Sequence, residues 1–188
     1  MAPAVVNPAS RFHVPSGADR KREKYLTPRE AERLLEDLQL ISCDMHDVAC
    51  IGLHTGMRLA EILGLHSDDI DFMAYVIHIR NGKTGSRVAY FPEGIAPLLK
   101  KRVQQCESST RLLFFTVNGN PVNPKRFSYE FSRTVTDMGF NDNVRDSVHK
   151  VTFHTLRHTF CSWLAMNGVS MQIIGELAGH SQLEMTRR

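Results

Sequence analysis

Apolar residues recur at helical spacing over much of the chain. In the first such run, Ala31, Leu34, Leu35 and Leu38 lie on one face, behind the capping box Thr27-Pro28-Arg29-Glu30. Similar signals predict helices over residues 44–54, 58–63, 94–105, 125–138, 154–167 and 170–177. Glycines follow several of these runs, as expected where a chain leaves a helix.

The pattern changes to strict alternation between residues 75 and 91. The segments YVIHIR (75–80) and RVAYF (87–91) are rich in β-branched and aromatic residues, and NGKTGS (81–86) separates them. An Asn-Gly pair between two alternating segments is a strong hairpin signal, so a hairpin is expected with its turn within residues 81–86, where Asn81-Gly82 is the strongest part of the signal. A short extended segment at 112–117 and a polar loop at 141–150 complete the pattern. The predicted fold is mainly α with a small antiparallel β-sheet, an α+β class.

Composition divides the chain into two parts. Residues 1–24 contain three prolines, little periodicity and the basic run Arg20-Lys21-Arg22, which is typical of a flexible linker or arm. Residues 25–188 are long enough for one globular domain, and 42% of all residues are hydrophobic. The net charge of +3 permits nucleic-acid binding without requiring it.

The cysteines and the lack of long apolar runs point to the cytoplasm. The four cysteines form no C-x-x-C pair, and no apolar run is long enough to span a membrane. Reduced core thiols are the simplest interpretation. Cys43, His46 and Cys50 could instead share a helical face and bind a metal, although no fourth ligand is apparent nearby.

The segment FHTLRHT (153–159) is the most specific candidate for chemistry. His154 and Arg157 are three residues apart at the start of a predicted helix, where the helix dipole and the guanidinium both favour an anion such as phosphate. His154 and His158 have the spacing of a zinc motif, but position 155 is threonine where that motif needs glutamate. A helix start with surface histidines is the remaining interpretation.

Three more segments carry candidate residues, each with a simpler alternative. Arg58 follows a Thr-Gly turn, and Glu61 lies one helical turn later, where it could orient the guanidinium or form an ordinary surface ion pair. Lys83 lies at the tip of the predicted hairpin and could reach a phosphate, or be a solvated turn lysine. His180 follows Gly179, which by itself is weak evidence.

Together the four segments resemble the tyrosine recombinases, also called the phage integrase family. That family has a T-G-x-R turn, a hairpin lysine, H-x-L-R-H at the start of a late helix and then L-G-H. This chain has TGMR, NGKTG, HTLRH and LAGH in the same order, and the resemblance covers residues 25–188. It implies the catalytic domain of a site-specific DNA recombinase or integrase of bacterial or phage origin, working on double-stranded DNA without metal or other cofactor.

The resemblance also implies a role for each matching residue. Arg58 and Arg157 would clamp the scissile phosphate, and Lys83 would protonate the leaving 5′ oxygen. His154 would assist proton transfer or hold the phosphate. His180 would hydrogen-bond a non-bridging oxygen, and Glu61 would support the site.

The family's nucleophile is a tyrosine nine residues beyond the histidine of G-H, which places it just after Arg188. The four tyrosines of the chain all precede His154 and do not match the motif. We therefore expect a catalytic domain that stops before its nucleophile and that binds DNA phosphate without cleaving by itself.

The resemblance extends to assembly and leaves alternatives open. The full-length parent would form a homotetramer on DNA, with a second domain preceding this one, whereas the isolated domain could be monomeric. The alternatives are a non-catalytic DNA-binding remnant, a relative of type IB topoisomerases, and a metal-dependent hydrolase.

Overall fold

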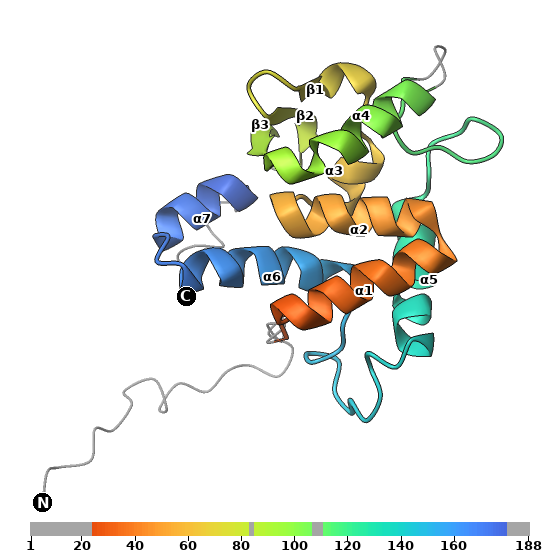
Figure 1. Cartoon of the computed structure of the whole chain (residues 1–188), viewed down its shortest axis with the longest axis vertical. Helices are drawn as coiled ribbons and strands as arrows, with labels where there is room; N and C mark the ends of the chain where they lie inside the picture. Colours follow the sequence, from red (N-terminus) through yellow and green to blue (C-terminus); the bar gives the residue numbers. More distant parts are fainter. Residues whose placement is uncertain (1–23, 83–84, 107–110, 180–188) are drawn as a thin grey trace, which may run out of the picture.

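A computed structural model describes residues 24–82, 85–106 and 111–179. The elements are α1 (Pro28–Ile41), α2 (Cys43–Thr55), α3 (Leu59–Leu63), β1 (Ile70–Asp71), β2 (Val76–Gly82), β3 (Gly85–Tyr90), α4 (Ala96–Gln105), α5 (Pro124–Asp137), α6 (Phe153–Met166) and α7 (Met171–Ala178), with short 3-10 turns at Ser67–Asp69 and Glu93–Ile95. The mainly helical fold with a small antiparallel sheet confirms the predicted class (Figure 1). The predicted linker, residues 1–24, lies outside the described residues except for Lys24.

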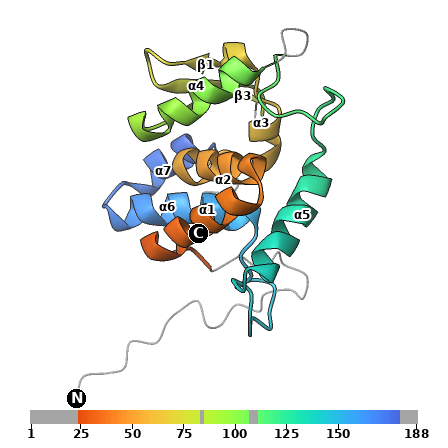
Figure 2. The ribbon, with the colours of Figure 1, turned by 45° about the vertical axis from the view of Figure 1, so that its right-hand side comes forward.

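The core lies where α2 packs between α1 and α6 (Figure 1). Helix α2 is buried on nearly all sides, and Val48, Ala49 and Ile51 are fully buried. Such a helix needs neighbours all round. Figure 2 shows α5 upright beside these helices, with the sheet and α4 gathered at one end of the molecule.

Local signals placed most helix boundaries correctly. The capping box at α1 is present, with Glu30 N–H donating to Thr27 Oγ1 (3.2 Å) and Thr27 N–H to Glu30 Oε2 (2.8 Å). At the end of α2, Gly56 adopts the left-handed conformation (φ 64°). Its φ suits glycine because a Cβ is disfavoured there.

The sheet contains the predicted hairpin but differs from the prediction in its strand ends and in an additional strand. Strands β1, β2 and β3 pair antiparallel in that order, and β1 was not predicted. Strand β2 continues to Gly82, which pairs with Gly85, so the predicted hairpin is present but its strands extend further into residues 81–86 than expected. Tyr75, expected in a strand, has φ 55° and precedes β2. The pairing passes through a register irregularity between Ile79 and Gly82, so Asn81 and Gly82 lie in β2 and not in the turn.

Residues 112–117 form isolated bridges rather than a strand. Leu112 bridges to His66 and Phe115 to Pro121. Arg111 has φ 55°, which bends the backbone at the start of the segment. The segment therefore anchors a connection between α4 and α5 without extending the sheet.

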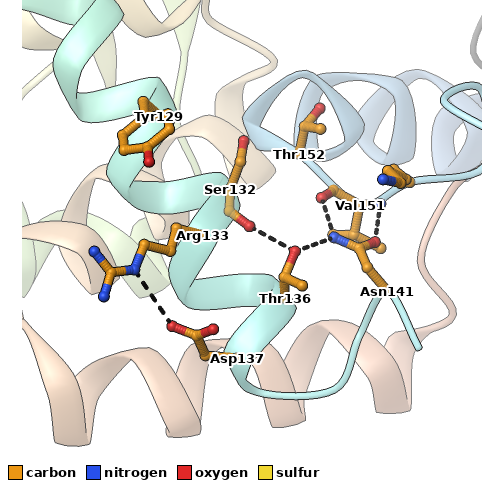
Figure 3. A pocket seen from close by; sticks show the side chains of 9 residues that line it. Tyr129, Ser132, Arg133, Thr136, Asp137, Asn141, Val151 and Thr152 are labelled. Atoms are coloured by element: carbon orange, nitrogen blue, oxygen red, sulfur yellow. Dashed lines mark hydrogen bonds and ion pairs between the residues drawn. The ribbon is translucent and has the colours of Figure 1, made fainter.

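The polar loop before α6 is held by Asn141. Its amide donates to Val151 O (3.1 Å) and Thr136 Oγ1 (3.0 Å), and its Oδ1 accepts from Val151 N–H (2.7 Å). The three bonded residues line a hollow of about 290 Å³ between α5 and the loop (Figure 3). They position the segment that leads into α6.

Among the described helices, none is both long and apolar enough to cross a bilayer.

Candidate functional site

Arg157 is an almost fully buried arginine on α6, with 4% of its surface exposed. Its Nη1 donates to Gly56 O (2.6 Å), at the carboxyl end of α2, and to Ala178 O, at the carboxyl end of α7. Carboxyl ends of helices carry partial negative charge and unpaired carbonyls, so both favour a cation. The guanidinium is therefore held by two helix ends that are far apart in sequence.

Arg58 and Glu61 lie at the start of α3, where Arg58 is the N-cap residue. The Glu61 carboxylate accepts from Arg58 N–H (2.9 Å) and from Arg58 Nη1 (3.1 Å). Arg58 Nη2 donates to Gly179 O (2.9 Å). The Glu61 side chain is only 4% exposed, so the alternative of an ordinary surface ion pair is wrong.

Arg87 on β3 joins these residues from the other side. Its Nη2 donates to Glu61 Oε2 (2.8 Å), and its Nη1 donates to Leu177 O (3.2 Å). We call Arg58, Arg87, Arg157 and Glu61 the guanidinium cluster. Its members come from α3, β3 and α6, and they meet at the end of α7.

The end of α7 supplies three consecutive acceptors to the cluster. The carbonyl of Leu177 accepts from Arg87, that of Ala178 from Arg157, and that of Gly179 from Arg58. Gly179 has φ 69°, and a Cβ there would lie 2.6 Å from Arg87 Cδ. Glycine is thus required both by the conformation and by the close approach.

Positive charge exceeds negative charge in the cluster, since three guanidiniums face one carboxylate. Burial and the neighbouring charge of Arg58 lower the pKa of Arg157 to about 10, so it remains a cation at neutral pH. Burial would raise the pKa of Glu61, but hydrogen bonds from Arg58 and the charge of Arg87 outweigh it and lower that pKa. An anion at this site would relieve the repulsion between the guanidiniums.

The predicted residues are only partly brought together in the described part of the chain. Arg58, Glu61 and Arg157 share the cluster, whereas His154 is exposed on the first turn of α6. On the same helix, Arg157 is bonded to the carboxyl ends of α2 and α7. Lys83 and His180 lie outside the described residues, and the expected tyrosine lies beyond Arg188.

The alternative sites receive no geometric support from the described residues. No three His, Cys, Asp or Glu side chains there are grouped as metal ligands. His46 Nδ1 is 2.7 Å from Asp47 Oδ1, and Cys43 is exposed, whereas Cys50 is buried beside His54. His158 is paired with Ser162, one turn further along α6 (3.2 Å). None of the cluster residues lines the hollow beside α5.

Sequence reasoning missed Arg87 and the carbonyl acceptors. One signal for Arg87 was present, because alternation along β3 puts it on the same side as Ala89, which is fully buried. A charged residue at a core-facing strand position needs a partner. The carbonyls of residues 56 and 177–179 have no sequence signal, because every residue carries one.

Comparison with known proteins identifies the relatives of this arrangement. The sequence model of the phage integrase family matches residues 24–188. The integrase of Salmonella phage P22 is 28% identical over 178 residues, covering 89% of this chain and 43% of that protein. Tyrosine recombinase XerA of Pyrococcus furiosus is 28% identical over 165 residues, covering 87% of this chain and 56% of that protein.

A solved structure gives the same result for the fold. The Tn1549 transposon integrase in complex with transposon right end DNA matches with a TM-score of 0.76 and 26% identity, covering 92% of this chain and 62% of that chain. This chain therefore spans about half the length of the relatives it matches.

Proposed function

Since this chain belongs to the phage integrase family, we propose that it is the catalytic domain of a site-specific DNA recombinase whose guanidinium cluster binds the phosphate at which DNA is cut. The observation that carries the proposal is the surplus of buried positive charge in that cluster. A DNA phosphodiester is an anion of matching geometry for arginine, which can donate two parallel hydrogen bonds to its oxygens.

In the proposed reaction, a tyrosine hydroxyl attacks the phosphorus and the 5′ oxygen of the next nucleotide leaves. A 3′-phosphotyrosine bond replaces the phosphodiester bond, and the reverse step rejoins the strand. Arg58 and Arg157 stabilise the charge that develops on the non-bridging oxygens. Glu61 orients Arg58, consistent with their contact at 3.1 Å.

The roles of the other residues follow from the family. Lys83 gives a proton to the leaving 5′ oxygen, His154 assists proton transfer or holds the phosphate, and His180 donates to a non-bridging oxygen. The nucleophile is the tyrosine expected just after Arg188. Residues 25–188 would form the catalytic domain, and residues 1–24 a linker to another domain.

Assembly and location belong to the same proposal. The full-length protein would act as a homotetramer on double-stranded DNA, in the cytoplasm of a bacterial cell where that DNA lies. The relatives described above are named integrases and recombinases, which favours recombination over a topoisomerase activity.

The test is formation of a covalent protein–DNA adduct. The chain, with the residues that its gene encodes after Arg188, is incubated without metal with a suicide substrate carrying its recombination site. An adduct on a denaturing gel is expected. Arg157→Ala should slow its formation by about 10²–10³-fold, the usual effect of removing one donor to a transition-state oxyanion.

Two controls separate the alternatives. Arg33→Ala removes an exposed arginine outside the cluster and should leave the rate unchanged. Excess EDTA should also have no effect, and a loss of the adduct with EDTA would favour a metal-dependent enzyme. DNA binding without an adduct would indicate a non-catalytic DNA-binding relative.

A further inference from the structure

Arg87 is an unusual residue for a three-stranded sheet with one exposed face. It lies on the core-facing side of β3, and its side chain is only 12% exposed. Taking a guanidinium out of water is costly unless its partners compensate. Apart from a long bond to Val88 O (3.5 Å), the partners of Arg87 are Glu61 of the guanidinium cluster and Leu177 O at the α7 end that holds the cluster. Its burial is therefore tied to that cluster.

We propose that Arg87 is a positioning residue, which locks Glu61 and the carboxyl end of α7 in place so that Arg58 and Arg157 meet the DNA phosphate in a fixed orientation. This inference rests on the proposed function. Arg87 is assigned a positioning role because its Nη2 and Nη1 are bonded to Glu61 (2.8 Å) and Leu177 O (3.2 Å) and its side chain is only 12% exposed.

The first part of the argument is the orientation of Glu61. Its Oε1 accepts from Arg58 Nη1, while its Oε2 accepts from both Arg58 N–H and Arg87 Nη2. Without Arg87, the carboxylate would be bonded to Arg58 alone, through the backbone N–H and the guanidinium of that residue. The second ion pair, from β3, therefore restrains Glu61 and shares its negative charge between Arg87 and Arg58, which leaves Arg58 less fully neutralised.

The second part is the end of α7. Arg87 holds Leu177 O, which precedes the two carbonyls that hold Arg157 and Arg58. The Nε of Arg87 is buried and has no hydrogen-bond partner among the described residues, and it lies against the backbone of Gly179. The position in which the guanidinium bonds both Glu61 and Leu177 O leaves this N–H unsatisfied. A shift of Arg87 would therefore move the acceptors of both other arginines.

The experiment measures DNA affinity against salt for the wild-type chain and for Arg87→Met, with a fluorescent duplex of mixed sequence. Arg87→Met should weaken binding by roughly tenfold, as expected for a residue that orients binding groups. It should leave the slope of log K against log salt unchanged, because no phosphate contact is lost. Arg157→Met should instead reduce that slope by about 0.9, the value for one phosphate contact. A reduced slope in Arg87→Met would overturn the proposal.

A second readout is the titration of the Glu61 carboxyl, followed by carbon NMR. The charged groups that act on it are Arg58 from α3, Arg87 from β3 and Arg157 from α6. Its pKa should rise in Arg87→Met and rise less in Arg87→Lys, which keeps the charge but not the two-pronged donor. An unchanged pKa in a folded Arg87→Met would overturn the proposal.

A double-mutant cycle tests whether Arg87 acts through Glu61. In a Glu61→Gln background, Arg87→Met should lower affinity clearly less than in the wild type, whereas additive effects would contradict the proposal. Arg102→Met is the matched control, since Arg102 is equally buried but is paired with Asp44 and Asp47. It should change neither the salt slope nor the Glu61 titration.

These readouts separate this inference from the proposed function. If the wild-type chain binds no DNA, the proposed function fails. The Glu61 titration then still decides whether Arg87 positions that carboxylate.

Discussion

Two left-handed glycines hold the backbone acceptors on which the arginines depend. Gly56 ends α2 with φ 64°, and its carbonyl accepts from Arg157. Gly179 ends α7 with φ 69°, and its carbonyl accepts from Arg58. In both cases the turn that ends the helix also aims a carbonyl at a guanidinium. The local signals for helix termination therefore also specify the site.

Gly56→Ala should destabilise the chain more than Gly168→Ala. Both glycines have positive φ, which costs a residue with a Cβ about 1–2 kcal/mol. A Cβ at 56 would also collide with the Phe160 ring, whereas one at 168 would have nothing within 4 Å. Overpacking adds about 1–3 kcal/mol, so urea unfolding should show a total loss of about 2–5 kcal/mol for Gly56→Ala. Equal losses for the two variants would show that the ring moves aside without cost.

Glu61 should make the stability of the chain depend on acid. Its pKa is lowered in the folded state, so its stabilising contribution is complete above the ordinary glutamate pKa of about 4.3. That contribution is lost as the pH falls through the lowered pKa. The difference in unfolding free energy between wild type and Glu61→Gln should therefore be largest near neutrality and shrink on acidification. A difference that stays constant with pH would contradict this assignment.

At the scale of elements, long-range pairs fix segments whose own preferences are weak. Arg102 ties α4 to α2 through Asp47 (2.5 Å) and Asp44 (2.6 Å). Asn141 similarly ties the loop after α5 to Val151, just before α6. The start of α6 matters for the site, because it sets the position and the direction of the Arg157 side chain on that helix.

Asn141→Ala should cost about 2 kcal/mol, because Val151 would lose both of its bonds to the side chain and its buried N–H would be unsatisfied. Chemical denaturation measures the loss, and amide exchange at the start of α6 should become faster. Asp142→Ala changes an exposed neighbour in the same loop and should stay within about 0.5 kcal/mol of the wild type. Similar stabilities of the two variants would show that the loop does not depend on Asn141.

At the scale of the whole molecule, the fold concentrates positive charge without neutralising it. Arg157 is almost fully buried and the Arg87 side chain is only 12% exposed, so the repulsion between the guanidiniums is poorly screened by solvent. A ligand that supplies negative charge at this point should therefore stabilise the entire domain.

DNA should raise the free energy of unfolding through this linkage. At a duplex concentration 100 times the Kd, the gain should be about 2.7 kcal/mol, seen as a higher Tm. At the same DNA concentration, Arg157→Met should gain less, because its Kd is weaker. Heparin is a comparison polyanion without the phosphodiester geometry. If heparin stabilises wild type and Arg157→Met by the same amount as DNA, the charge surplus acts without a specific phosphate site.

The sequence by itself determined the helices with strong caps, the existence of the hairpin and the fold class. These are local properties, since a capping box, an apolar stripe or an alternating strand involves neighbours within a few residues. It also placed Arg58, Glu61 and Arg157 among the candidates. The strands of the hairpin reach further into residues 81–86 than predicted, because strand pairing, a longer-range effect, includes Asn81 and Gly82 in β2.

Only the tertiary structure decided how the site is assembled. It brought Arg87 of β3 to Glu61 of α3, and it placed three successive carbonyls at the end of α7 against three arginines. The physical reason is that a buried charge must find its partners wherever the fold supplies them, and carbonyl acceptors carry no mark in the sequence. The sequence therefore identified most of the candidate phosphate-binding residues, and tertiary packing determined which groups hold them in place.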